Sequence, residues 1–97
     1  MFTNNAKIII GRNEEENKIL QKIKNPKDIV MEAKNVKGPI SIIQGESNTN
    51  ILKFAGSLTL RYSDYKEETG VVVFKSDEDK SYQELEVSKA KKQDYIA

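Results

Sequence analysis

Apolar residues occur along the chain in short β-branched runs separated by polar segments, and the period of each run predicts an element. Residues 7–10 end in three isoleucines and are closed by Gly11, which predicts a short buried strand. In residues 28–34, Ile29, Met31 and Ala33 alternate with more polar positions, as in a strand with two distinct faces. Further strands are predicted at residues 40–44, 71–74 and 83–88, the last alternating as a sheet edge would.

Two segments have the period of a helix. In the first, Asn13 is a good N-cap, and Glu16 three residues later completes a capping box. We expect this helix to continue to Lys24, with Ile19, Leu20 and Ile23 as its apolar stripe, and to end at Asn25-Pro26 because proline cannot continue the ladder. The second runs from residue 48 to about residue 65, with apolar residues at three- and four-residue spacing: Ile51, Phe54, Ala55, Leu58, Tyr62 and Tyr65.

These elements define the expected fold. The strands at 28–34 and 40–44 are separated by a turn containing Gly38, which predicts an antiparallel hairpin. Gly56, inside the long helix, is expected to let another element approach closely, and Tyr62 and Tyr65 are expected in the core. We therefore predict one α+β domain over residues 1–97, a small and mostly antiparallel sheet with two helices packed on it. Residues 1–6 and the last residues are expected to be flexible.

Several classes of function are excluded by composition. The chain has no cysteine and no histidine, so the usual zinc ligands and the Ser-His and Cys-His nucleophile pairs cannot be assembled. Glu14, Glu15 and Glu16 point about 100° apart on a helix and do not converge. The acidic segment 77–79 lacks the glycine and closing glutamate of a calcium loop and is expected to be a solvated loop. We expect no catalytic residue, no metal and no cofactor.

The surroundings of the protein follow from what its sequence lacks. No apolar stretch approaches the ~20 residues that a membrane-spanning helix needs. The first seven residues also lack the apolar segment of a signal peptide. We expect a soluble cytoplasmic protein without a membrane partner.

Charge gives only local candidates for a binding surface. The net charge is +1, whereas nucleic-acid-binding domains usually have a pI above ~9, so binding would need a local patch. Arg12 stands beside a helix N-terminus, where an anion is favoured, although it could instead pair with a local acid. Arg61 on the second helix could bind phosphate or extend past apolar surface to solvent. Lysines that could contact phosphates, or simply be solvated, gather at a turn and the tail: Lys34, Lys37, Lys89, Lys91 and Lys92.

Taken in order, a series of short motifs resembles a known family. The series comprises Ile10-Gly11-Arg12-Asn13 with Asn17 and Ile19-Leu20, then residues 26–30, Gly38, residues 55–63 ending in Tyr62-Ser63, Val87-Ser88-Lys89, and Tyr95. It resembles the NFACT-R domain, the RNA-binding domain named from the NFACT proteins of ribosome quality control. The similarity covers residues 7–96 and is strongest to the variant at the C-terminus of PP-loop proteins described as tRNA 2-thiouridine synthases or methyltransferases.

The resemblance implies a non-catalytic RNA-binding module that holds tRNA for a PP-loop catalytic domain in cis or in trans. Such a module would be either an excised domain or an unusually short protein. The Gly-Arg-Asn motif implies roles for Arg12 and Asn13, and the Val-Ser-Lys motif for Ser88 and Lys89. Lys34, Lys37 and Arg61 are the further expected RNA contacts. Where the NFACT proteins have His-Ala-Asp and a later histidine, this chain has residues 32–34, Glu-Ala-Lys, and Lys37, so no histidine role transfers.

A second class of function stays open from the sequence. The near-neutral charge and the alternating strand 83–88 also suit a protein-interaction appendage, which either docks on a catalytic domain or forms a homodimer.

Overall fold

The computed structural model describes residues 2–3 and 6–90. The expected flexible ends fall mostly outside this range, and the tail residues Lys91, Lys92 and Tyr95 fall wholly outside it. The elements in chain order are β1 (Phe2–Thr3), β2 (Ala6–Ile10), α1 (Glu14–Ile23), β3 (Ile29–Ala33), β4 (Ser41–Gly45), α2 (Thr49–Arg61), β5 (Thr69–Lys75) and β6 (Gln83–Ser88). The predicted elements are all present. β1 is an additional strand, which the apolar pattern of the sequence does not predict.

The strands form one sheet in the order β1-β2-β4-β3-β5-β6, with every neighbouring pair antiparallel. The predicted hairpin of β3 and β4 is present, with Val30 opposite Ile42. β4 also pairs with β2 on its other side, where Ile9 lies opposite Ile42. β6 pairs with β5 and, within the described residues, ends the sheet, as its alternating pattern predicted.

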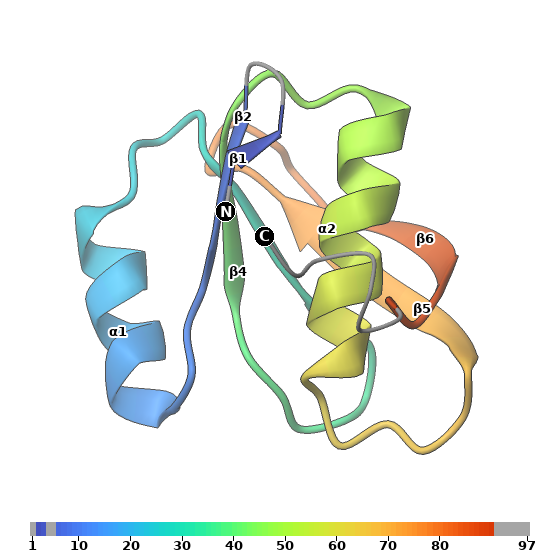
Figure 1. The fold of residues 1–97 in the computed structure, drawn as a ribbon. Coiled ribbons are helices and arrows are strands. Elements are labelled where there is room, and N and C mark those ends of the chain that lie inside the picture. Colours follow the sequence, from blue (N-terminus) through green and yellow to red (C-terminus); the bar gives the residue numbers. More distant parts are fainter. Residues whose placement is uncertain (1, 4–5, 91–97) are drawn as a thin grey trace.

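The strand order explains where the helices lie. β2 and β3 run in the same direction on either side of β4 and are joined by α1, while β4 and β5 flank β3 and are joined by α2. The two crossovers step the same way across the sheet but start from strands of opposite direction. Crossovers of one hand must then place their helices on opposite faces. Figure 1 shows α1 and α2 on the two sides of the sheet, so the domain is α+β with three layers.

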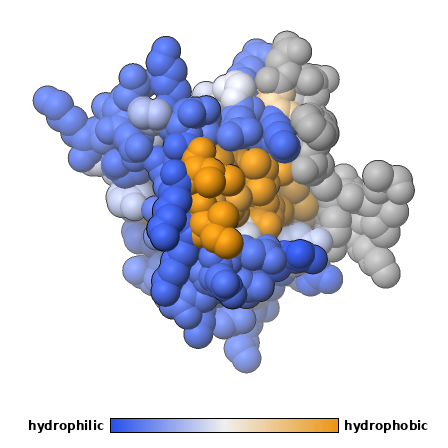
Figure 2. Space-filling model, turned by 90° about the vertical axis from the view of Figure 1, so that its left-hand side faces the viewer, coloured by the Kyte–Doolittle hydropathy of each residue, from blue (hydrophilic) through white to orange (hydrophobic). Residues whose placement is uncertain are grey.

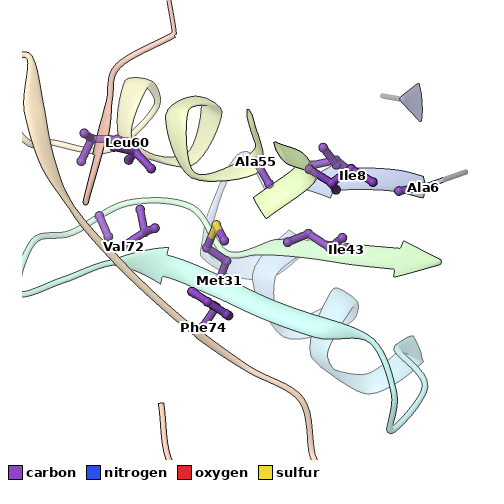
Figure 3. Packing of buried hydrophobic residues seen from close by; sticks show 11 residues of the cluster. Ala6, Ile8, Met31, Ile43, Ala55, Leu60, Val72 and Phe74 are labelled. Carbon is purple, nitrogen blue, oxygen red and sulfur yellow. The ribbon is translucent and has the colours of Figure 1, made fainter. Parts of the chain in front are cut away.

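The main core lies between α2 and the sheet. Ile8, Met31, Ile43, Ala55 and Val72 are almost completely buried there, and Figure 3 shows them packed together with Leu60 and Phe74. A Cβ added to Gly56 would lie 3.0 Å from methyl groups of both Val72 and Val87. The expected close approach at Gly56 is confirmed: β5 and β6 pack directly on this part of α2.

The face that carries α1 is only partly covered. Leu20 is the buried residue of α1, whereas Ile19 and Ile23 expose 50% and 65% of their surface. The predicted three-residue stripe is therefore wrong for Ile19 and Ile23, because α1 contacts the rest of the domain mainly through Leu20. Figure 2 shows apolar side chains gathered on this side of the molecule, with hydrophilic ones above, below and to the left of them.

The far end of α1 is tied to the turn between β5 and β6. The Lys24 ammonium lies 2.7 Å from Oδ2 of Asp77, and the N–H of Asp77 donates to the Pro26 carbonyl oxygen at 3.1 Å. The Lys24 side chain is only 7% exposed. The acidic segment 77–79 is thus more than the solvated loop that was expected, since it anchors the end of a helix more than 50 residues away in the chain.

Candidate functional site

In the described part of the chain, a cavity of about 810 Å³ lies at the N-terminal end of α1. Three separate segments line it. The first is residues 10–14 with the first two turns of α1, the second is residues 37–40 before β4, and the third is the end of α2 at Tyr62 and Asp64. Glu32 of β3 completes the lining.

The first two segments are joined through Asn17 and Gly11. The Asn17 side-chain oxygen accepts a hydrogen bond from the Ile40 N–H at 3.1 Å, and the Gly11 N–H donates to the Ile40 carbonyl oxygen at 2.9 Å. A Cβ on Gly11 would lie 2.1 Å from that same Asn17 oxygen and 3.2 Å from Leu20. A side chain at this position would displace the Asn17 amide from Ile40.

The second and third segments meet at Gly38. A Cβ on this glycine would lie 2.6 Å from the Cβ and 2.8 Å from the Cα of Ser63. The N–H of Asp64 donates to the carbonyl oxygen of Lys37 at 2.8 Å, which closes the contact. The loop before β4 therefore lies directly on the chain that leaves α2, and these contacts fix one wall of the cavity.

The N-terminus of α1 forms another part of the lining. The Asn13 side chain accepts from the Glu16 N–H at 2.9 Å, which confirms Asn13 as the N-cap. The Glu16 carboxylate reaches back to Arg12 rather than to Asn13, accepting from the Arg12 backbone N–H at 3.0 Å and lying 3.3 Å from the guanidinium. These hydrogen bonds from Arg12, the backbone one foremost, lower the pKa of Glu16. The alternative that Arg12 pairs with a local acid is thus confirmed.

That ion pair leaves Arg12 available to a ligand. Its side chain is 83% exposed, and the partner carboxylate is 35% exposed. Exposed ion pairs of this kind contribute little to stability, because water and salt screen both charges. The guanidinium therefore stands at the rim of the cavity with donors that a phosphate or a base edge can take up.

The cavity has mixed charge and one aromatic side chain. Its basic residues are Arg12, Lys18 and Lys37, and its acidic residues are Glu14, Glu32 and Asp64, so the charges balance. The apolar part is formed by Ile10, Pro39, Ile40 and the ring of Tyr62. Glu32 and Lys37, two of the positions at which the sequence departs from the resembled pattern, both line this cavity.

Three of the seven residues predicted for RNA contact come together here: Arg12, Asn13 and Lys37 all line the cavity. The other four have different surroundings. Lys34 forms an ion pair with Glu84 of β6 at 2.8 Å, and Arg61 is exposed in the last turn of α2.

Ser88 is the last residue of β6 and Lys89 follows it, and neither residue lines the cavity. The Ser88 hydroxyl lies 3.4 Å from that of Thr69, and the Lys89 ammonium donates to the Tyr65 carbonyl oxygen and lies 5.9 Å from the centre of the Tyr65 ring. These contacts hold the end of β6 to the first residue of β5 and to the segment that precedes it.

Tyr62 lies at the surface and not in the core, where its sequence pattern predicts it. Its position in the apolar period predicted burial, but α2 ends at Arg61, and Tyr62 is the C-cap with 53% of its surface exposed. Tyr65 is half-buried against the core, as predicted. The sequence signal that could have separated them is the polar run Ser63-Asp64, which favours a turn after Tyr62 over a continued helix.

Two kinds of site are absent from the described residues. No three or more carboxylate side chains come together there in a way that could hold a metal ion. Over the same residues, no helix has both the length and the apolar character needed to cross a membrane.

The fold is that of a small α+β domain, and its cavity is lined by charged, polar and apolar side chains. The whole chain, residues 1–97, matches the model of the NFACT protein RNA binding domain, and the protein belongs to that family. No protein of curated function matches it. Its fold is similar to that of the C-terminal part of the fibronectin/fibrinogen-binding protein from Streptococcus suis, with a TM-score of 0.79 and 16% identity. The similarity covers 88% of this chain and 41% of that one.

Proposed function

We propose that this domain holds tRNA through the cavity at the N-terminus of α1, as a non-catalytic module of a tRNA-modifying protein. The single observation that carries the proposal is the meeting of Arg12, Lys37 and Tyr62 from three distant segments in one cavity. The family supplies the class of ligand, RNA. The cavity volume falls within the ~300–1,000 Å³ of typical ligand sites.

Each of the three residues offers a contact that RNA can use. Arg12 presents a planar fork of donors suited to a phosphate, and Lys37 presents a point charge on the neighbouring loop. The half-exposed ring of Tyr62 gives a base a surface to stack on. Asn13 lines the same cavity, although its side-chain oxygen is already used to cap α1.

The link to tRNA modification rests on the resemblance to the variant that follows PP-loop catalytic domains. A module of this kind contributes binding energy and position, while the reaction takes place on the catalytic domain. Deletion of the gene should then lower a thiolated or methylated nucleoside in tRNA, measured by mass spectrometry of digested tRNA. An unchanged modification profile would contradict this part of the proposal.

Binding itself is tested by fluorescence anisotropy with labelled tRNA at low and physiological salt. Arg12→Ala and Lys37→Ala should each weaken binding and make its salt dependence shallower, because each removes a phosphate contact. Lys80→Ala, an exposed lysine in the β5–β6 turn, is the matched control and should change little. Equal affinity of the wild type and the three variants would exclude the cavity as the binding site. No binding at low salt would exclude RNA as the ligand.

A second candidate is a docking appendage, and the exposed isoleucines of α1 favour it. Ile23 is 65% exposed, and β6 offers an open sheet edge within the described residues. Either the exposed isoleucines or this edge could contact the catalytic domain or a second copy of the chain. Sedimentation at high concentration distinguishes the two forms: a strict monomer excludes the homodimer, and a dimer that Ile23→Lys dissociates supports it.

A further inference from the structure

We infer that the cavity accepts one unstacked nucleotide, its base against Tyr62 and its neighbouring phosphates on Arg12 and Lys37, so that the bound RNA segment is single-stranded. This inference rests on the proposed RNA-binding function and adds to it the form of RNA that the cavity selects. Three properties of the site carry it: its concave shape, the fixed position of Tyr62, and its balanced charge.

The shape of the cavity decides between single-stranded and double-stranded RNA. The lining comes from three segments around a half-open hollow of about 810 Å³ rather than from a flat or ridged surface. A base in a duplex has both faces stacked and its pairing edge occupied, so it cannot enter such a hollow without being extruded. A base in a loop or at a chain end can enter without that cost.

Tyr62 is held in place by its own backbone. It caps α2, and its N–H donates to the carbonyl oxygens of Leu58 and Leu60. The next two residues are fixed as well, since Ser63 lies against Gly38 and the Asp64 N–H donates to the Lys37 carbonyl oxygen at 2.8 Å. The backbone from which the ring projects is therefore held in place, which reduces the entropy lost when a base stacks on the ring.

The charge of the cavity favours contact with a base over contact with a long stretch of backbone. Three basic residues face three acidic ones, so the site has little net attraction for a polyanion. The acidic side chains can instead accept hydrogen bonds from the amino groups of a base. With at most three phosphate contacts, at about 0.7 per phosphate for single strands, the plot of log K against log salt should have a slope no steeper than about −2.

The experiment compares a labelled single-stranded oligonucleotide with a blunt duplex of the same sequence, using the full chain. The single strand should bind and the duplex should bind at least about tenfold more weakly. Tyr62→Ala should lose roughly 5- to 150-fold in affinity for the single strand, the range found when a stacking aromatic residue is removed, and Tyr62→Phe should retain it. Tyr82→Ala, a tyrosine of similar exposure in the β5–β6 turn, is the matched control.

A fluorescent base in the oligonucleotide gives an independent signal, because 2-aminopurine should be quenched on binding to the wild-type protein and not to Tyr62→Ala. Thermal melting confirms that each variant is folded. Equal binding of duplex and single strand, with Tyr62→Ala no weaker than Tyr82→Ala, would overturn the inference while leaving RNA binding intact. Failure to bind any RNA would overturn both the inference and the proposed function.

Discussion

The side-chain oxygen of Asn17 accepts a hydrogen bond from the backbone N–H of Ile40, 3.1 Å away. This contact joins the second turn of α1 to the segment that enters β4, 23 residues further along the chain. It passes over Gly11, whose missing side chain leaves room for the Asn17 amide. One asparagine thus holds two of the three segments that line the cavity.

Asn17→Ala should lower the free energy of unfolding by about 1–3 kcal/mol, because the half-buried N–H of Ile40 would lose its acceptor. Asn17→Asp keeps an oxygen in the same place and should cost less. Urea denaturation followed by circular dichroism measures both. Asn50→Ala, at an exposed position of α2, is the control and should change stability by less than about 0.5 kcal/mol. Equal stability of the alanine and aspartate variants would contradict the role given to the Asn17 oxygen.

Gly38→Ala should destabilise the domain by about 1–3 kcal/mol, because the new methyl group would meet the backbone of Ser63 and the loop would have to move. The same displacement would move the cavity wall next to Tyr62 and so widen the cavity. Chemical denaturation measures the stability loss. Lys37→Ala changes the neighbouring side chain without adding a clash and should stay within about 0.5 kcal/mol. A Gly38→Ala protein as stable as wild type would show that this loop yields freely.

Glu16→Gln should strengthen RNA binding. The substitution removes a negative charge 3.3 Å from the Arg12 guanidinium, a charge that competes with phosphate for the same donors. We expect the affinity for RNA to rise about two- to fivefold, because the ion pair that is lost is exposed and therefore weak. The same anisotropy assay measures this change. Glu15→Gln, in the same turn of α1, controls for the loss of one negative charge near the site. Weaker binding by Glu16→Gln than by Glu15→Gln would mean that Glu16 positions Arg12 for RNA rather than competing for it.

The Lys24–Asp77 pair should make stability depend on pH in the acid range. The hydrogen bond from the Lys24 ammonium, more than its charge alone, lowers the pKa of Asp77. A carboxylate whose pKa is lower in the folded state stabilises the fold above its unfolded pKa of about 4, and this contribution is lost as pH falls through the lowered folded value.

Asp77→Asn should therefore melt at a lower temperature than wild type at pH 7, and the difference should shrink as the pH is taken well below 4. Glu78→Gln, the neighbouring carboxylate in the same turn, is the matched control. Melting curves at neutral and acid pH measure the effect. A difference between Asp77→Asn and wild type that is the same at both pH values would exclude Asp77 ionisation as its cause.

Much of the secondary structure could be predicted because its causes are local. The N-cap of α1 depends on Asn13 and the residue three positions later, and the burial of Met31 and Ala33 follows from strand alternation. The edge position of β6 follows from its alternating polar and apolar residues. Each of these depends on residues within about one turn or one strand, where side-chain period and backbone hydrogen bonding are already determined.

The helix end at Arg61 could not be predicted from the apolar period, which continues through Tyr62 and Tyr65. The period shows which residues would share a face, but not whether the backbone stays helical. Tertiary contacts decide this here: the Asp64 N–H donates to the Lys37 carbonyl oxygen, and Gly38 lies against Ser63. These contacts require the chain to turn after Tyr62, and they leave its ring at the cavity instead of in the core.

The sequence by itself determined the α+β class of the fold, where its helices begin, which strand faces are apolar and that these residues offer no histidine or cysteine chemistry. The tertiary structure alone decided that β4 lies between β2 and β3, that α1 and α2 cover opposite faces, and that Arg12, Lys37 and Tyr62 meet at one cavity. The physical reason for this division is the distance along the chain over which each interaction acts. Period and capping act between neighbours in the chain, whereas strand order and the meeting of distant loops depend on crossovers whose gain appears only when the whole sheet has assembled.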